Sequence, residues 1–315
     1  MQTFILRRLL IGVVILFILS VTVFALLRIA PGDPAIRICG LNCTNDQIAQ
    51  IHHDLGLDES YPQQYWDWIG GVLKGDLGTS SVNHKPVGQQ IIHYFPVTLE
   101  IMVLTLLITI VVGIPFGIIS AVMKNTIIDY LVRTIAVFGL AVPGFWVATL
   151  VLVFPAVWWG YAPTLGRAVP ITEDPIGNLQ QYLPAAAVLS LGSAAGVMRL
   201  TRSSLLEVMR ADYMRTARAK GLRERVVIVS HGLKNSLIPV ITVLGLQIAG
   251  LLGGAIIIEQ IFTLPGEGLF TLNALLSKDF DVVQTMTLYA GVAVVMLNLM
   301  VDVCYAWLDP RIRYS

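Results

Sequence analysis

The sequence predicts an all-α integral membrane protein with six transmembrane helices. Of its 315 residues, 56% are hydrophobic and only 13% are charged, about half the charged share of a soluble domain. Six apolar runs have close to the ~20 residues that a helix needs to cross ~30 Å of hydrocarbon. Backbone groups in lipid must be satisfied within the segment, so these runs are expected to be helical. The six expected spans are 9–27, 99–123, 134–158, 183–200, 237–258 and 285–308.

The first expected span lies close to the start of the chain. It is long, it continues into Leu26, Leu27 and Arg28, and it lacks a small-residue cleavage site. A cleaved signal peptide has a shorter apolar core that is followed by such a site. Residues 1–29 are therefore expected to form an N-terminus and a first transmembrane helix that stays in the membrane.

The distribution of lysine and arginine predicts the orientation of the chain. With the N-terminus inside, 15 of the 21 basic residues fall on the cytoplasmic side. The six on the other side are Arg28, Arg37, Lys74, Lys85, Arg167 and Lys278. Cytoplasmic loops carry the excess of Lys and Arg, so both termini are expected to be cytoplasmic. The net charge of +1 does not suggest nucleic-acid binding.

Residues 30–96 form the longest stretch between two expected spans, on the outer side. Thr44 and Gln47 have the spacing of a capping box, and Gly56 stands where the helix that they begin would end. Aromatic residues suited to the membrane–water interface follow at Tyr65, Trp66 and Trp68. We expect an extracytoplasmic loop with short helices on the membrane face, and no independent domain.

Two of the three cysteines lie together in this outer loop. Cys39 and Cys43 are in an oxidising setting, where disulfides form and persist. We expect a bridge between them, with two reduced thiols as the alternative. Cys304, in the last span, is expected to pack as an apolar residue.

Residues 97–315 carry the other five expected spans, which are expected to form the membrane core. Glycines four positions apart allow close helix packing, and such pairs occur at Gly113/Gly117, Gly192/Gly196 and Gly250/Gly254. Proline kinks helices, so we expect kinks in the second and third spans at Pro115, Pro143 and Pro155. The segment 264–268, Leu-Pro-Gly-Glu-Gly, is expected to fold back toward the membrane edge.

The loop at about 203–236 is polar, basic and helix-forming, unlike the chain around it. We expect one helix from about Glu207 to Lys220, a turn at Gly221, and a second amphipathic stretch over 223–235. The expected apolar side of the first helix is Leu206, Met209 and Tyr213, and the arginines available to acidic groups of a partner are Arg210, Arg215 and Arg218.

The two short helices expected in this loop, joined at Gly221, indicate a docking site for a soluble partner. Movement of that partner would be transmitted to the transmembrane helices. The alternative is an inner loop that its basic residues hold to anionic lipid head groups.

Motifs for catalysis and nucleotide binding are absent from the sequence. It contains no Gly-x-x-x-x-Gly-Lys-Ser/Thr loop, no His-Glu-x-x-His pattern and no Gly-x-Ser-x-Gly elbow. We expect no catalytic residues and no bound cofactor or metal, so the energy for any work on the spans must come from a partner. Asp302 lies in the last span, where charge is costly unless it is paired. We expect it to pair with a basic group near the inner face, with a direct role in gating as the alternative.

Two blocks of this loop follow a known pattern. They are Asp212-Tyr-Met-Arg-Thr-Ala-Arg-Ala-Lys-Gly221 and His231-Gly-Leu-Lys-Asn-Ser-Leu-Ile-Pro239. Together they resemble the ATPase-contacting loop of ABC importer permeases of the dipeptide, oligopeptide and nickel family, with Arg215-Thr216-Ala217 in place of the general Glu-Ala-Ala. Further blocks resemble this family along almost the whole chain, among them Arg28-Ile-Ala-Pro-Gly-Asp-Pro34 and Glu259-Gln-Ile-Phe-Thr-Leu-Pro-Gly266. The long outer loop is similar to that of the first of the two paired permeases.

The resemblance implies a type I ABC importer permease in the bacterial plasma (inner) membrane, without enzymatic activity of its own. It implies a homologous second permease, two ATP-binding subunits that bind the ATP and Mg, and an extracytoplasmic solute-binding protein. The cycle it implies is alternating access. The residues that it assigns to the ATPase-coupling loop are Glu207, Arg210, Asp212, Tyr213, Arg215, Thr216, Ala217, Arg218, Lys220 and Gly221.

The cargo stays open between dipeptides, oligopeptides, glutathione and nickel chelates. The spans lack an obvious cluster of His, Met or Cys ligands for naked metal, which favours peptides over the nickel alternative. A self-sufficient channel or ion-driven carrier would show internal repeats and several mid-membrane charges. A membrane enzyme would show clustered catalytic groups near a span end. We find neither pattern in the sequence.

Overall fold

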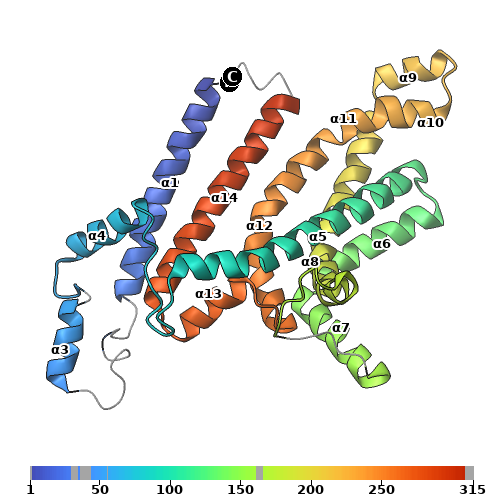
Figure 1. Cartoon of the computed structure of the whole chain (residues 1–315). Coiled ribbons are helices and arrows are strands. Elements are labelled where there is room, and N and C mark those ends of the chain that lie inside the picture. Colours follow the sequence, from blue (N-terminus) through green and yellow to red (C-terminus); the bar gives the residue numbers. More distant parts are fainter. Residues whose placement is uncertain (1, 30–34, 36–43, 55, 161–165, 309–315) are drawn as a thin grey trace. The chain divides into compact units, whose positions relative to one another are not determined.

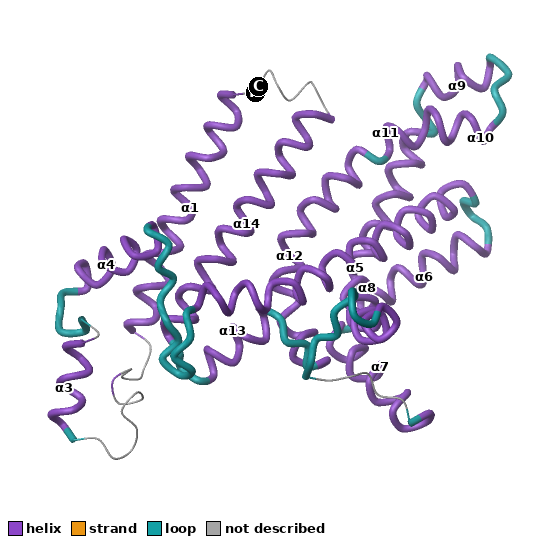
Figure 2. Tube along the Cα trace, viewed as in Figure 1, coloured by secondary structure: helices purple, strands orange, loops and turns teal. Residues whose placement is uncertain are grey.

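The computed structural model describes residues 2–29, 35, 44–54, 56–160 and 166–308. Within these residues the chain is built from helices joined by turns and loops (Figure 2), which confirms the expected all-α fold. The helices divide into two compact units, each described below by itself. Unit 1 comprises Met1–Pro96 and Gly266–Leu299, and unit 2 comprises Val97–Pro265 and Met300–Ser315.

Four helices of the described chain are long and apolar enough to cross a membrane unbroken. They are α1 (Gln2–Ile29), α5 (Val87–Val122), α8 (Pro175–Val208) and α14 (Phe280–Leu308) (Figure 1). They contain the expected first, second, fourth and sixth spans. The fifth expected span falls on α12 (Ile238–Phe262). Three bent helix pairs raise the possible number of spans to seven, so the expected six lies within the range that the helices allow.

The third expected span is not one helix. Residues 134–158 fall on α6 (Ile127–Ala141) and α7 (Gly144–Trp159), which meet at an angle of 98°. Pro143 is the cause, because proline has no N–H to donate and pushes the residue before it out of helical conformation. Val142 is accordingly extended, with φ −83° and ψ 127°. The kink expected at this proline is therefore a complete break, whereas Pro155 lies inside α7 and Pro115 inside α5.

In unit 1, α1 and α14 approach closely through glycines. A Cβ on Gly12 would lie 2.8 Å from Val295 Cγ1, and one on Gly291 would collide with the Leu19 side chain. The buried core of this unit is formed by Val87, Ile91, Ala274, Val282, Val283 and Met286. Its members come from α5, α13 (Glu267–Leu276) and α14, so residues from two distant parts of the sequence build one core.

The capping box predicted at Thr44 is confirmed. The backbone N–H of Thr44 donates to Gln47 Oε1 at 3.0 Å, and the Gln47 N–H donates back to Thr44 Oγ1 at 3.4 Å. The helix α3 (Asn45–Asp54) follows, and Gly56 closes it with φ +64°. The next helix, α4 (Tyr61–Leu73), carries the interface aromatics. Its Tyr65 is buried against Phe24, while Trp66 is exposed.

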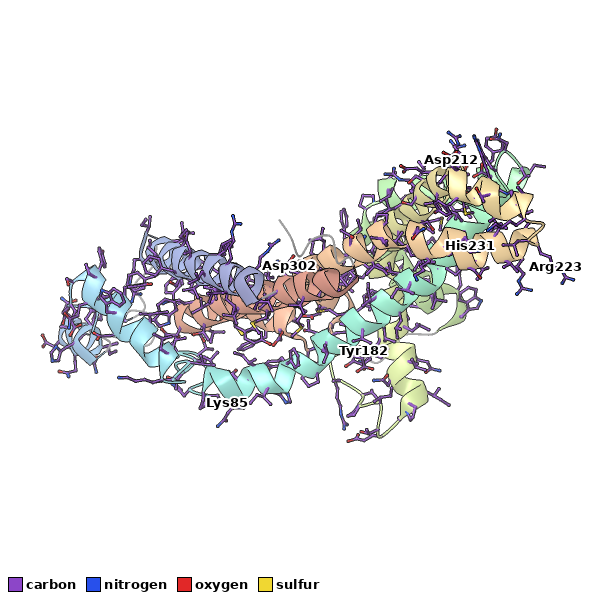
Figure 3. All side chains as sticks on the ribbon, turned by 90° about the horizontal axis from the view of Figure 1, so that it is seen from above. Lys85, Tyr182, Asp212, Arg223, His231 and Asp302 are labelled. Carbon is purple, nitrogen blue, oxygen red and sulfur yellow. The ribbon has the colours of Figure 1, made fainter. Side chains whose placement is uncertain are left out.

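In unit 2, α8 is the central packing partner. A Cβ on Gly113 of α5 would lie 3.0 Å from the Ala194 carbonyl oxygen, and one on Gly117 would lie 2.7 Å from that of Met198. The first predicted glycine pair is thus a point of close helix approach. Tyr182 of α8 is fully buried in the largest core cluster (Figure 3). Helix α8 continues from these contacts to Val208, within the loop at 203–236.

Candidate functional site

The loop at 203–236 begins within the last two turns of α8, which ends at Val208. The first separate helix of the loop is shorter than predicted. Helix α9 covers Asp212–Ala219, so the expected continuous helix from Glu207 to Lys220 is wrong. Residues 209–211 form a turn in which Arg210 N–H donates to the Glu207 carbonyl at 3.1 Å. Ala211 is extended and precedes the helix. Asp212 follows in the first turn of α9, where a carboxylate interacts favourably with the helix dipole.

The buried face of α9 also differs from the prediction. Met214 and Ala217 are buried and form a cluster with Val227, whereas Tyr213 is 43% exposed. The turn at 209–211 explains the difference, because it rotates α9 relative to α8. Leu206, Met209 and Tyr213 therefore do not share one helix face. The apolar contacts of α9 point toward the second half of the loop.

That second half is helical, as expected, but it is irregular. It consists of α10 (Glu224–Val226), the π-helical turn η1 (Val227–Leu233) and α11 (Lys234–Ser236). Gly232 of η1 lies beneath α9, and a Cβ there would come within 3.3 Å of Met214 Cε and 3.4 Å of Leu205 Cδ1. Met214 is fully buried at this contact. The end of α8, α9 and η1 therefore pack together around one methionine.

Polar contacts reinforce the packing of the loop. Arg218 donates to both carboxylate oxygens of Glu224, at 2.9 and 3.1 Å, and its Nη1 lies 3.4 Å from the Met209 carbonyl oxygen. The Glu224 carboxylate raises the pKa of Arg218, which keeps the guanidinium charged. Asn235 donates to the Tyr213 hydroxyl at 3.0 Å. Arg218 thus stabilises the loop itself, and its pairing with an acidic group of a partner stays a prediction.

The turn after α9 depends on Gly221. Its φ is +78°, and an added Cβ would meet no atom within 4 Å. Glycine is used here for its backbone conformation and not for space. The expected turn at this position is present in the structure.

The other face of the loop is polar and exposed. The exposed residues of this face are Glu207, Arg210, Asp212, Tyr213, Arg215, Thr216 and Lys220. Arg215 lies 3.6 Å from Asp212 in a pair that is almost fully exposed. Helix α9 is thus fixed to the rest of the loop by apolar contacts on one face and presents charged side chains to solvent on the other.

Comparisons with known proteins identify the family. Residues 113–314 match the family described as binding-protein-dependent transport system inner membrane component, and residues 1–102 match its N-terminal membrane component family. The chain belongs to this family of inner membrane transport components. It is accordingly a multi-pass membrane protein.

Relatives of this transport component match along its full length. A putative peptide transport system permease protein of Brucella abortus is 38% identical over 315 residues, covering 100% of both chains. An oligopeptide transport system permease protein of Bacillus subtilis is 37% identical over 316 residues, and a glutathione transport system permease protein of Pectobacterium atrosepticum is 38% identical over 315 residues. Each of these also covers 100% of both chains.

Solved structures show the same fold. A chain of the MetNI methionine ABC transporter in an inward-facing conformation aligns with a TM-score of 0.57 and 17% identity, covering 70% of the transport component and 97% of that chain. A chain of an amino acid ABC transporter gives a TM-score of 0.51 at 13% identity. The expected type I importer permease architecture agrees with the first of these alignments.

Other predictions concern residues outside the sequence of this loop. Asp302 is half-buried in α14, and its pairing with a basic group stays a prediction. Cys39 and Cys43 lie outside the described residues. Among the described residues, no group of three His, Cys, Asp or Glu side chains could hold a metal ion.

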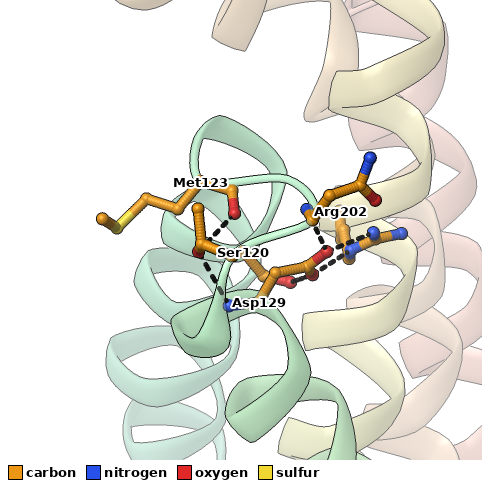
Figure 4. A network of polar contacts seen from close by, with 6 residues as sticks. Ser120, Met123, Asp129 and Arg202 are labelled. Atoms are coloured by element: carbon orange, nitrogen blue, oxygen red, sulfur yellow. Dashed lines mark hydrogen bonds and ion pairs between the residues drawn. The ribbon is translucent and has the colours of Figure 1, made fainter.

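One buried ion pair was missed by the sequence analysis. Asp129 of α6 and Arg202 of α8 bind each other beside Ser120 (Figure 4). Arg202 is one of the 15 basic residues expected on the cytoplasmic side. The spacing of Thr126 and Asp129 is that of a helix cap, and this signal could have marked the carboxylate.

Proposed function

We propose that this chain is a permease subunit of an ATP-driven importer of peptides in the inner membrane. The observation that carries the proposal is its full-length similarity, at 37–38% identity, to peptide, oligopeptide and glutathione transport permeases. The helical fold and the packed loop at 203–236 support it. The chain itself contributes the membrane pathway by alternating access and no catalytic step.

The proposed assembly contains a homologous second permease, two ATP-binding subunits and an extracytoplasmic solute-binding protein. The family description, which refers to a binding protein, supports the last of these. ATP and Mg would be bound by the ATP-binding subunits. The excess of Lys and Arg on one side supports an orientation with both termini in the cytoplasm. Residues 1–29 would form the anchor, 30–96 the extracytoplasmic loop, and 97–315 the permease core.

Helix α9 is the proposed contact with an ATP-binding subunit. Its exposed face offers charges and a tyrosine to a partner, and interfaces of this kind use electrostatic complementarity for specificity. Its buried face rests on Leu205 of α8 through Met214 and Gly232. A displacement of α9 would therefore be passed to α8 through Gly232 of η1, because close-packed interiors transmit strain.

The cargo class can be tested by reconstitution. The chain, its second permease, the ATP-binding subunits and the binding protein are incorporated into proteoliposomes, and uptake of a labelled dipeptide, a longer peptide, glutathione and a nickel chelate is compared. We expect ATP-dependent uptake of a peptide that requires every component. Uptake of the nickel chelate only would replace the cargo proposal with the alternative of metal-chelate import.

The same preparation tests the alternative of a self-sufficient channel or carrier. Proteoliposomes that contain only this chain are expected to show no uptake with or without ATP. Transport by the isolated chain would overturn the permease proposal.

Substitutions at Gly221 are expected to separate backbone conformation from size. Gly221→Val should reduce coupled uptake by roughly tenfold or more, because a β-branched residue at positive φ is strained by about 1–3 kcal/mol. Gly221→Asn should retain most of the uptake, because asparagine tolerates the left-handed region and the space around the site is open. Uptake and ATP hydrolysis are measured for both in proteoliposomes. Equal losses in the two variants would contradict a conformational role.

A further inference from the structure

The ion pair between Asp129 and Arg202 joins two helices of unit 2 (Figure 4). Arg202 Nε donates to Asp129 Oδ1 at 2.8 Å, and Nη2 donates to Oδ2 at 2.9 Å. The Asp129 side chain is fully buried, and the Arg202 side chain is 20% exposed. This is the bidentate geometry that makes an arginine–carboxylate pair both strong and directional.

The carboxylate of Asp129 is also fixed from its own side. Ser120 Oγ donates to Oδ1 at 2.6 Å, and the Asn125 N–H donates to Oδ2 at 3.0 Å. Thr126 caps α6 by accepting from the Asp129 N–H at 3.4 Å. The carboxylate therefore closes the turn between α5 and α6 and binds that turn to α8.

A buried ion pair is weak evidence for stability. Its desolvation often offsets the attraction, and apolar residues of similar volume can replace such pairs without loss. Its geometry, in contrast, fixes how two elements sit against each other. Arg202 lies six positions before the end of α8, so the pair is close to the point where α9 leaves that helix.

The rest of α6 is also attached to α8. Val132 and Ala136 are buried against Ala195 and Met198. A Cβ on Gly139 would lie 3.1 Å from both Ala195 Cβ and the Leu191 carbonyl oxygen. Helix α6 is therefore held to α8 from its first turn to the residues just before the break at Pro143.

A cavity of about 390 Å³ lies at this break. Its lining includes Val142, Pro143 and Gly144 from the break, Leu191 and Gly192 from α8, and Ile257 from α12. Non-helical backbone at membrane depth is tolerated where it is buried in protein or lines a cavity. The cavity therefore lies where the end of α6 meets the start of α7.

We propose that Asp129 and Arg202 are positioning residues that make α6 move together with α8. Movement of α9 is then carried along α8 and α6 to the broken span and its cavity. This inference rests on the proposed function. It adds that α6 moves together with α8. It also adds that the Asp129–Arg202 ion pair, which lies away from both the cargo and the ATP, controls the coupling of ATP hydrolysis to cargo import.

The test compares Asp129→Asn, Arg202→Met and the double variant in the complete reconstituted complex. ATP hydrolysis and cargo uptake are measured on the same proteoliposomes. For Asp129→Asn and Arg202→Met, we expect ATP hydrolysis to persist while the number of ATP hydrolysed per cargo imported rises by about tenfold, a typical coupling factor between two sites. The double variant should be no worse than either single one, because both remove the same interaction.

Asp279→Asn is the matched control. Asp279 is also a buried carboxylate, bound by Ser80 and Ser81 through their hydroxyls. It lies in unit 1, outside α6 and α8. We expect its ATP-to-cargo ratio to equal that of the unmodified complex, whatever its effect on the amount of folded protein.

Two results would overturn the inference. One is an unchanged ratio in Asp129→Asn and Arg202→Met, with hydrolysis and uptake falling together. The other is an equal rise of the ratio in Asp279→Asn. The unmodified complex separates these outcomes from a failure of the proposed function, because it must itself show ATP-dependent uptake.

Discussion

Gly117→Ala is expected to destabilise the permease more than any other single methyl addition among its described membrane glycines. The new Cβ would lie 2.6 Å from Thr201 Cβ and 2.7 Å from the Met198 carbonyl oxygen, and a backbone atom cannot rotate away. Overpacking of this kind costs about 1–3 kcal/mol. We expect the thermal midpoint of the purified complex to fall and less complex to be recovered from membranes.

Gly250→Ala provides the control for this substitution. Gly250 lies inside α12, and a Cβ there would meet no atom of the chain within 4 Å. Alanine is favoured over glycine in a helix interior by roughly 0.5–1 kcal/mol, so this variant should be neutral or slightly stabilised. If both variants had the same midpoint, the close approach of α5 and α8 would not be a feature of the folded permease.

Met214→Ala is expected to uncouple transport. The Met214 side chain is fully buried, and its end lies beside Gly232 of η1, which also contacts Leu205 of α8. Truncation of such a methionine costs about 2–5 kcal/mol. The loss is local, because α9 would no longer rest on α8 and η1. We expect uptake to fall by about tenfold or more while ATP hydrolysis persists, in line with typical coupling factors.

Met123→Ala is the control variant, because it truncates a methionine that is exposed and not buried. Met123 is 38% exposed at the end of α5, so its truncation should leave both activities within about twofold of the unmodified complex. Uptake and hydrolysis are measured in proteoliposomes of equal protein content. Normal coupling in Met214→Ala would show that movement reaches α8 by another route.

The parts of this fold that depend on local chemistry could be predicted from the sequence. The capping box at Thr44 and the turns at Gly56 and Gly221 involve only neighbouring residues, and all three are present. The apolar runs predicted the long helices, because a helix is one of the few structures in which all backbone N–H and C=O groups are hydrogen-bonded within the lipid. The family resemblance, carried by blocks along almost the whole chain, agrees with the full-length relatives.

Features that depend on packing between distant residues could not be predicted. Pro143 predicted a kink, but the size of the bend between α6 and α7, 98°, also depends on how these helices pack against the rest of unit 2. The start of α9 at Asp212 depends on the burial of Met214 and Ala217 beneath it. The partner of Asp129 is 73 residues away, and no periodicity connects the two.

The most direct test of the account is a photo-crosslinking residue at Thr216 in the assembled complex. Thr216 is exposed on α9, which we propose as the contact with the ATP-binding subunit. We expect a cross-link to that subunit whose yield changes when ATP is added, and none from the same photo-crosslinking residue at Met300, which is 58% exposed in α14. Cross-links from Thr216 to lipid only would contradict it and would identify the loop as a basic surface held to head groups.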